Sequence, residues 1–378
     1  MNPYDFVRID WTRSPERRTP TWHHRLHSWS GRELYSGHLN VDVYVETAFF
    51  IGGARVTSGD PKKPTPFIQN GKGEYIIPGS SLKGLLRCLV ETLANGCMTI
   101  FDGDYERRKV DYNRKVPATF QRCSTNTDLC IACRIFGMLG GRDGRGGTFL
   151  GKTNIGDAVV YPDKIYLHDP IYTKLLMEPR PHHRSFYLDE SERYIAGRKY
   201  YFHHSPDTPL EVETKLLYNR NGYASNYYIQ PLDYETAFHF RIDFTNLESD
   251  EFAALLFAIV LEDSMRHQLG YGKPLGLGTV ALWPTSLTLI DYTARYTRPS
   301  KDRGRKTIEG NDVWQFIYEQ TDTFNDTHLM NRAMQDLRRI WQWPPDAEVE
   351  YYYPSKRDWF DTNESIGKRI ADTKYVPR

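Results

Sequence analysis

Three cysteines lie within eleven residues, in the stretch CSTNTDLCIAC. Cys123, Cys130 and Cys133 have the Cys-x-x-Cys spacing, with a third thiol nearby, that is typical of tetrahedral zinc sites. Such a metal would staple a polar segment that is too small to stabilise itself. Cys97 is the first candidate for the fourth ligand, and Cys88 or a histidine remains an alternative. Three unconnected thiols are the simpler interpretation.

The stretch IIPGSSLKGLLR starts like a loop and continues like a helix. A helix start offers unpaired N–H groups and the positive end of the helix dipole, which together favour a bound anion. Gly79 would let a phosphate approach the backbone, Ser80 and Ser81 add hydroxyl donors, and Lys83 and Arg87 add charge. The alternative is an ordinary serine-capped helix with a solvated lysine.

A second glycine-rich stretch, GYGKPLGLG, covers residues 270–278. A helix is expected before it and a strand after it, so it is not the dinucleotide-binding fingerprint, in which a helix follows directly. Its exposed backbone beside Lys273 suits close approach of a sugar-phosphate chain. A mobile turn is the alternative.

The stretch GGTFLGKT, residues 146–153, matches the Walker A pattern by letter. A phosphate-binding loop of that kind needs a strand before it and a helix after it. The stretch that follows, NIGDAVVYPDK, is strand-like and is broken by proline. The sequence therefore argues against a P-loop ATPase.

Candidate acid–base groups lie in two loops. Asp60, in TSGDPKK, is placed to hold a metal or to orient a ribose 2′-hydroxyl, although an aspartate before proline is also a common turn residue. The pairs His182–His183 and His203–His204 could supply an acid and a base, or could be surface or RNA-stacking groups.

The composition limits the possible partners. The formal net charge of the 378 residues is +1, so an anion site must be local rather than part of a basic surface. The 26 tyrosines supply many flat faces on which bases could stack. No apolar run reaches membrane-spanning length and no signal peptide is present, so a cytoplasmic protein with reduced thiols and no membrane partner is expected.

The elements that would position these residues follow a recognisable order. A strand is expected at 39–48, and a helix from Leu82 to Leu93, capped by Ser80 or Ser81 and ended by Gly96. A second strand should lie within 148–161, a third at 238–247, a helix at 249–262 and a last strand at 279–291. This β-α-β-β-α-β order predicts the α+β class and a ferredoxin-like (RRM-like, split βαβ) core.

The remaining segments complete the predicted domain organisation. Residues 1–38 are read as an irregular N-terminal arm and 39–291 as the core. Insertions are expected at about 97–150, rich in cysteine, and at 163–237. Residues 292–378 are charged and rich in Tyr and Pro, and are read as a C-terminal extension.

Five motifs, in order, resemble the RAMP superfamily of CRISPR systems: IPGSSLKGLLR, CIACRIFG, GKTNIGDAV and GYGKPLGLGTV, with FRIDFTNLESDEFAALLFAI before the last. NPYDFVRID near residue 2 and GRKYYFHH at 197–204 strengthen the likeness, which spans roughly residues 1–290. The chain is most similar to backbone-type subunits of type III effector complexes.

The resemblance implies a core that grips guide CRISPR RNA and positions target RNA, alongside other RAMP subunits and the large subunit of an antiviral ribonucleoprotein. The 163–237 insertion would hold a thumb-like element that wedges between guide and target. The residues expected at the RNA are Gly79, Ser80, Ser81, Lys83, Arg87, Arg55, Arg134, Gly272, Lys273 and Gly276.

Catalytic members of the family carry an aspartate in the loop before IPGSSLKG and cut target RNA as metal-dependent endonucleases. Asp60 lies in that loop, a few residues earlier than strict register places the catalytic position, near Pro64. Mg²⁺ is the implied cofactor if Asp60 acts; otherwise Asp60 is a turn residue. The alternative function is a RAMP endoribonuclease that processes precursor guide RNA with histidine, although such nucleases generally lack PGSSLKG and the Cys-x-x-Cys insertion.

Overall fold

The structure is a computed structural model of the chain. It describes residues 2–23, 34–53, 63–98, 112–140, 146–177, 184–297, 301–328 and 332–354. The mixed α+β class expected from the sequence is confirmed.

Three long antiparallel strands form the centre of an eight-stranded sheet: β3 (Leu34–Val45), β14 (Ala237–Glu248) and β16 (Thr279–Ile290). The strand order is β15-β16-β3-β14-β9-β4, with β17 beside β16 and β8 beside β14. The shorter strands are β4 (Ile76–Ile77), β8 (Thr153–Ile155), β9 (Ala158–Val160), β15 (His267–Gln268) and β17 (Arg305–Glu309).

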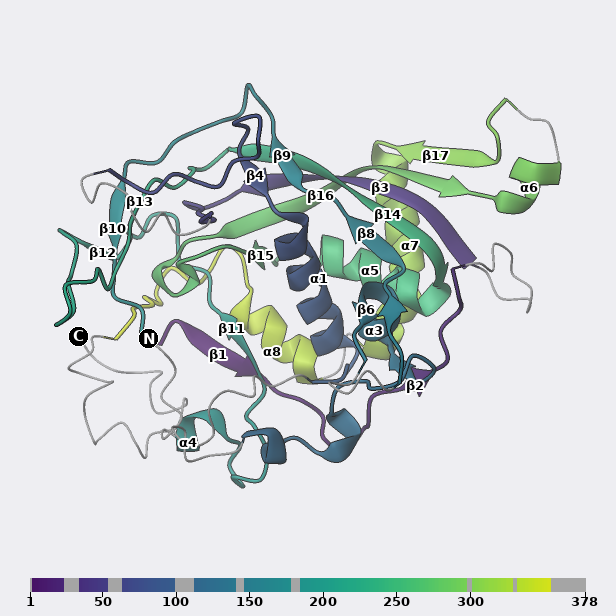
Figure 1. The fold of residues 1–378 in the computed structure, drawn as a ribbon, viewed down its shortest axis with the longest axis horizontal. Coiled ribbons are helices and arrows are strands. Elements are labelled where there is room, and N and C mark those ends of the chain that lie inside the picture. Colours follow the sequence, from purple (N-terminus) through teal and green to yellow (C-terminus); the bar gives the residue numbers. More distant parts are fainter. Residues whose placement is uncertain are drawn as a thin grey trace.

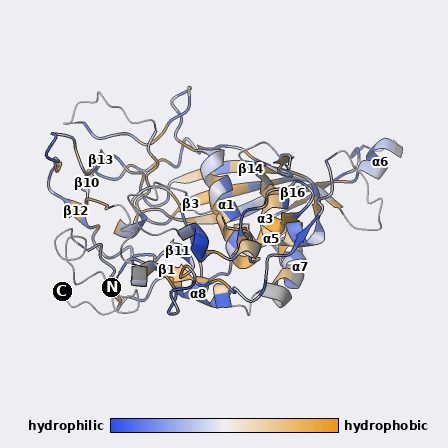
Figure 2. Cartoon of the chain, turned by 60° about the horizontal axis from the view of Figure 1, so that its bottom comes forward, coloured by the Kyte–Doolittle hydropathy of each residue, from blue (hydrophilic) through white to orange (hydrophobic). Residues whose placement is uncertain are grey.

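Alternation along the long strands decides which face of the sheet is buried. Val41, Val43 and Val45 are buried, whereas the residues between them are partly exposed. Helices α1 (Gly79–Leu93) and α5 (Ser249–Val260) pack on the buried face (Figure 1). Hydrophobic residues gather on α5 and α3 beneath the sheet, while the peripheral loops are mostly hydrophilic (Figure 2).

The cysteine-rich insertion consists of short elements. They are the 3₁₀ turns η1 (Tyr112–Lys115) and η2 (Ala118–Phe120), strands β5 (Leu129–Cys130), β6 (Gly137–Met138) and β7 (Phe149–Leu150), and helix α3 (Ile131–Phe136). Helix α3 packs against both α1 and α5. The insertion therefore touches the helix layer of the core.

The 163–237 insertion folds into two small units. Strands β10 (Ile171–Thr173), β12 (Val212–Glu213) and β13 (Tyr228–Ile229) form a three-stranded sheet. Strand β11 (Arg198–Tyr201) leaves that unit and pairs with β1 (Tyr4–Val7), and the short helix α4 (Arg184–Tyr187) precedes it.

The N-terminal segment, expected to be irregular, contains short strands within its described residues. Besides β1, the segment contains β2 (Arg17–Arg18), which pairs with β5, and its last residues already belong to β3. The alternation in β1 is too short to stand out in the sequence, and its partner β11 lies almost 200 residues away.

The segment after residue 291 is also more than an appendage. After α6 (Tyr292–Thr297), helix α7 (Asn311–His328) packs on α5, and α8 (Arg332–Ile340) packs on β1 and α1. Buried residues such as Ile317 and Leu337 join the main core. Within the described residues, no helix is both long and apolar enough to cross a membrane.

Candidate functional site

Helix α1 begins earlier than the sequence suggested. Pro78, not Ser80 or Ser81, is the N-cap residue, no side chain caps the helix, and the C-cap is Ala94 rather than Gly96. The Gly79 N–H donates to Asp157 Oδ1 at 2.7 Å. A carboxylate of the chain itself therefore binds the first amide of the helix, where a phosphate was expected.

Gly79 is required by packing. A Cβ at this position would lie 2.2 Å from the carbonyl oxygen of Ile155, so any side chain would collide with the backbone between β8 and β9. The glycine of PGSS thus lets the start of α1 press against the sheet. The group that approaches Gly79 here is the protein's own backbone, and the predicted contact of Gly79 with a phosphate stays a prediction.

The start of α1 and the glycine-rich loop share one concave site. A pocket of about 520 Å³ is lined by Ser81, Leu85 and Cys88 of α1 and by Gly270 and Lys273 of the loop. A second pocket, of about 270 Å³, also contains Gly272. Both pockets are lined by Lys199, Tyr201, Gly270, Tyr271 and Lys273, and together they are called the two-lysine groove below.

The loop holds its shape through glycines in left-handed conformations. Gly272 and Gly276 flank the 3₁₀ turn η3 (Lys273–Leu275) with φ of 77° and 90°. Gly278 has φ of 89°, and a Cβ there would lie 1.9 Å from the Leu269 carbonyl oxygen. The loop is therefore a tightly packed turn with Lys273 in its 3₁₀ turn.

Two ammonium groups face this groove without an acidic partner among the described residues. Part of the Lys199 side chain is exposed, but it lines both concave pockets, and its Nζ lies 3.7 Å from the ring centroid of Tyr4 and 4.7 Å from that of Tyr201. Lys273 Nζ donates to the Gly270 carbonyl oxygen at 2.6 Å. Reduced hydration in the concavity, together with the charge of Lys273, lowers the pKa of Lys199 to about 8. The electrostatics therefore favour an anion between them.

Tyrosines form much of the remaining wall. Tyr4, Tyr187, Tyr271 and Tyr353 line the smaller pocket. Burial, with the neighbouring Tyr353 and Tyr187, raises the pKa of Tyr201 to about 12, so its ring is neutral at pH 7. Flat neutral rings beside lysines suit a ligand with both anionic and aromatic parts.

Arg87 does not project freely from α1. Its Nε donates to Glu91 Oε1 at 2.8 Å, its Nη1 to the Gly137 carbonyl oxygen at 2.8 Å, and its Nη2 contacts Cys133 Sγ at 3.4 Å. Lys83 is partly buried, and burial with the nearby Arg87 charge lowers its pKa. Arg87 thus supports the cysteine-rich insertion.

Arg134 is buried within an ionic network. Its Nε donates to Glu251 Oε1 at 2.7 Å and its Nη2 to Asp250 Oδ2 at 2.8 Å. Lys152 Nζ donates to Glu251 Oε2 at 2.6 Å, and both side chains are 0% exposed. The structure thus places Arg134 away from any surface that RNA could reach. Lys152 is the lysine of GGTFLGKT, so this lysine is paired with the buried Glu251 carboxylate, and it is followed by strand β8 rather than by the helix that a P-loop requires.

Four cysteines converge in the insertion. The sulfur atoms of Cys97, Cys123, Cys130 and Cys133 all lie within 4.8 Å of one another, and all four residues are buried. Cys97 Sγ and Cys133 Sγ are 3.7 Å apart. Four thiolates around zinc, with Zn–S bonds near 2.3 Å, give sulfur–sulfur separations of about 3.8 Å. The cluster can therefore bind a metal ion such as zinc, with Cys97 as the fourth ligand and Cys88 outside the cluster.

One arginine connects this cluster to the groove. Arg198 Nη2 donates to the carbonyl oxygens of Cys97 at 2.9 Å and Gly96 at 3.3 Å, and its Nη1 lies 3.1 Å from Glu91 Oε2. Arg198 is the first residue of β11, the strand that carries Lys199 and Tyr201. The cluster thus helps to set the position of that strand.

The described histidine pair is not at the surface. His203 Nε2 donates to the Arg266 carbonyl oxygen, and its Nδ1 bonds to Thr279 Oγ1, both at 2.9 Å. Burial lowers the pKa of His203 to about 3. His204 is also buried.

Four of the residues singled out from the sequence lie outside the described residues: His182, His183, Asp60 and Arg55. Ser80 is exposed at the helix start, and Gly276 lies beside His204.

Sequence reasoning did not single out Lys199, Tyr201 or Asp157. The stretch GRKYYFHH contained a signal, because residues at i and i+2 of a strand share one face, which puts Lys199 and Tyr201 together. Asp157 follows glycine in a short loop, and nothing local indicates that it reaches α1.

Comparison with known proteins gives one family. The family model of the RAMP superfamily matches residues 42–281, more than half of the chain, and no curated protein matches. The matched segment runs from within β3 to the first residues of β16, and so includes α1, the cysteine cluster and the glycine-rich loop. The chain therefore belongs to the RAMP superfamily, and this membership implies a CRISPR-associated, RNA-binding role.

Proposed function

We propose that the chain is a guide-RNA-binding backbone subunit of a type III CRISPR effector complex. The observation that carries the proposal is the two-lysine groove. There the start of α1 meets the glycine-rich loop, and Lys199 and Lys273 have no acidic partner among the described residues. A sugar-phosphate chain supplies the missing negative charge.

The strand order supports a ferredoxin-like core. Taken in chain order, the four core strands are β3, β9, β14 and β16, and they lie in the sheet as β16-β3-β14-β9. This is the arrangement of a split βαβ fold, in which the third strand lies between the first and second. Helices α1 and α5 follow the first and third strands, as that fold requires.

The groove is suited to binding RNA without reading its sequence. Lysines and backbone amides contact phosphates and fix register, while base pairing between guide and target supplies specificity. Local charge explains how a chain with net charge +1 binds a polyanion. The tyrosines of the groove offer stacking faces that accept any base.

Zinc is the metal that we propose for the four-cysteine cluster. Four buried thiol ligands and no carboxylate or imidazole favour zinc as a closed structural centre. Bound zinc would cross-link the segments of the cysteine-rich insertion and would take no part in a reaction of the RNA. Arg87, at 3.4 Å from Cys133 Sγ, would offset the negative charge of four thiolates.

The test measures binding of a labelled CRISPR-repeat RNA to the purified full chain by fluorescence anisotropy across a salt series. Lys199→Met with Lys273→Met should weaken binding and reduce the slope of log K against log salt by about 2, one for each lost phosphate contact. Lys306→Met, an exposed lysine on β17, is the matched control and should leave the slope unchanged. Equal effects of the control and the groove variants would refute the proposal.

The same RNA distinguishes the alternative role. Metal-independent cleavage of the repeat RNA by the wild-type chain would indicate a processing nuclease instead of a backbone subunit. Cleavage of target RNA by Asp60 with Mg²⁺ stays a prediction, which Asp60→Ala in the assembled complex would test.

A further inference from the structure

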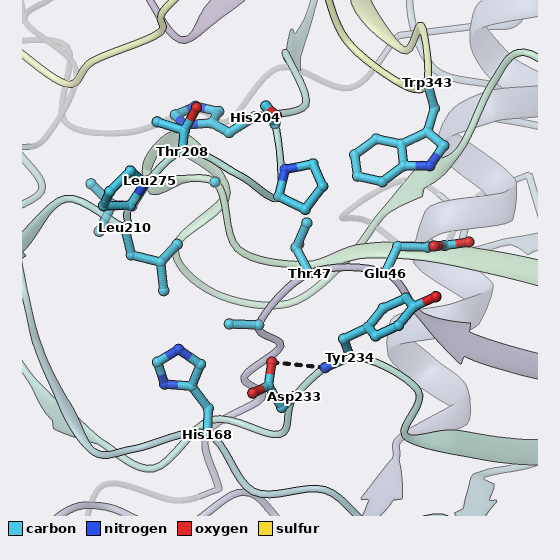
Figure 3. A pocket seen from close by; sticks show the side chains of 15 residues that line it. Glu46, Thr47, His168, His204, Thr208, Leu210, Asp233, Tyr234, Leu275 and Trp343 are labelled. Carbon is cyan, nitrogen blue, oxygen red and sulfur yellow. Dashed lines mark hydrogen bonds between the residues drawn. The ribbon is translucent and has the colours of Figure 1, made fainter. Parts of the chain in front are cut away.

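A cavity separate from the two-lysine groove, of about 480 Å³, lies at the far end of the glycine-rich loop. Leu275 and Gly276 form part of its wall, whereas residues 270–274 of the same loop line the two-lysine groove. The other walls come from residues 46–48 after β3, from three parts of the 163–237 insertion and from Trp343 (Figure 3). The loop is thus shared by two concave sites of different chemistry.

The charge of this cavity is opposite to that of the groove. None of the described residues that line it is a lysine or arginine, and two, Glu46 and Asp233, are acids. Glu46 Oε1 already pairs with Arg266 Nε at 3.3 Å. A phosphate is therefore disfavoured, and a ligand that donates hydrogen bonds is favoured.

Asp233 offers an acceptor to such a ligand. Its Oδ1 accepts the Tyr234 N–H at 2.8 Å, the bond drawn in Figure 3, while its Oδ2 has no partner among the described residues. Asp233 is half-buried beside His168, on the side of the cavity opposite Thr208 and His204 in Figure 3. A half-buried carboxylate oxygen that lacks a hydrogen-bond donor is poorly satisfied, so a donor on the ligand adds binding free energy at this position.

His204 supplies a second polar group without a partner. It is 7% exposed, and its Nε2 is buried without a hydrogen-bond partner in the described part of the chain. Burial lowers its pKa to about 4, so the ring is neutral at pH 7. The ring packs on Gly276, where a Cβ would lie 2.9 Å from it.

The rest of the lining is apolar or flat. Tyr234 is 56% exposed at the rim, Trp343 stands on another wall, and Leu210, Pro206 and Leu275 add apolar lining. A cavity of this size, with apolar walls and a few placed polar groups, is typical of a site for a small planar ligand.

We infer that this cavity binds one unpaired nucleobase with an exocyclic amino group, donated by the RNA whose backbone lies in the two-lysine groove. The amino hydrogens would meet Asp233 Oδ2, and the base would lie against the apolar walls. The inference rests on the proposed function. A guanidinium group from a partner protein is the competing ligand, but the shared loop favours the base.

The experiment compares fluorescein-labelled 12-residue oligo(C) and oligo(U) RNA on the full chain. Cytosine has an amino donor at C4 and an acceptor at N3, whereas uracil has a carbonyl oxygen at C4 and an N–H donor at N3, so their relative affinities report which donor of the base edge meets the carboxylate. Wild type should bind oligo(C) about fivefold or more tightly than oligo(U). Asp233→Asn keeps the bond from the Tyr234 N–H but offers an amide donor, so the preference should disappear or reverse.

The control is Glu235→Gln, which makes the same charge change at an exposed neighbour outside the cavity and should keep the preference. Tyr234→Ala should also reduce the preference, and melting temperatures verify that every variant is folded. Absence of a C-over-U preference in wild type, or equal weakening of both RNAs by Asp233→Asn, would overturn the inference while the groove variants still test RNA binding.

Two other results have defined meanings. Binding of a tetra-arginine peptide that depends on Asp233, without an RNA preference, would assign the cavity to a protein partner and overturn the inference. Failure of both RNAs to bind, with lysine variants identical to wild type, would remove the proposed function as well.

Discussion

A lysine in a concave site is less hydrated than a lysine in free solution, which disfavours its charged form and lowers its pKa. Lys199 illustrates this, because the surrounding protein and Lys273 lower its pKa to about 8. A bound phosphate would favour the charged form and raise that pKa. RNA affinity should therefore be constant below about pH 7.5 and fall as the pH rises through 8, since the free protein must then gain a proton in order to bind.

This pH dependence is measurable as the dissociation constant for the repeat RNA between pH 6.5 and 9.5. Lys199→Arg keeps a charge that does not titrate in this range and should flatten the profile. An unchanged profile in Lys199→Arg would assign the titration to another group.

Single residues were predicted unevenly from the sequence. Spacing alone identified three of the clustered cysteines, because these metal-ligand candidates recur within a short segment. Cys97 was the expected fourth ligand, and it lies in the cluster. Charge alone misplaced Arg134, because a buried ion pair with Glu251 looks the same in a sequence as a free arginine. Asp157 was missed because its partner, the Gly79 amide, is a backbone group.

At the scale of elements, the cysteine-rich insertion depends on its cluster. Its strands have two residues each and its helix has six, so none is stable alone. Cys130→Ser should abolish binding of the zinc proposed for the cluster and loosen the insertion, because structural metal contributes folding free energy directly. Cys88→Ser is the matched control, since Cys88 lies outside the cluster and should retain zinc.

Zinc content by mass spectrometry of the native protein, together with proteolysis between residues 112 and 140, measures both effects. One zinc per chain in Cys130→Ser would contradict the assignment of the ligands.

Elements with many periodic residues were the predictable ones. Strands β3, β14 and β16 are twelve residues long and alternate over much of their length, and α1 and α5 carry clear apolar positions. Strands β1 and β11 were missed because four residues give little periodicity and the pairing is distant. Helices α7 and α8 carry apolar positions at helical spacing, such as Val313 and Ile317 in α7 and Met334 and Leu337 in α8, but the charged, Tyr- and Pro-rich composition of the whole segment 292–378 hid them.

On the scale of the whole molecule, three buried histidines make the fold sensitive to acid. Burial lowers the pKa of His203 to about 3 and those of His204 and His267 to about 4. In the unfolded chain histidine titrates near 6.5, so below that pH the unfolded state binds protons that the folded state does not. The stability they contribute is complete above pH 6.5 and is lost as the pH falls towards 4.

Three such groups give a slope of up to about 4 kcal/mol per pH unit. Urea unfolding midpoints at pH 7.5, 6.5 and 5.5 measure it, and His267→Gln should reduce the slope by about a third. A midpoint that stays constant down to pH 5.5 would show that these histidines are protonated in the folded protein.

Strand β1 is held by α8, which lies more than 300 residues later in the chain. The Arg8 backbone N–H and side chain bond to Asp336 at 2.7–2.9 Å, although the two residues are 328 positions apart, and Arg339 pairs with Asp5 at 2.6 Å. At a translation rate of about 5–20 residues per second, β1 therefore waits roughly 15–65 s on the ribosome before α8 is made. Tyr4 and Tyr353 line the same pocket, so a nascent chain has no finished groove until synthesis has passed residue 353.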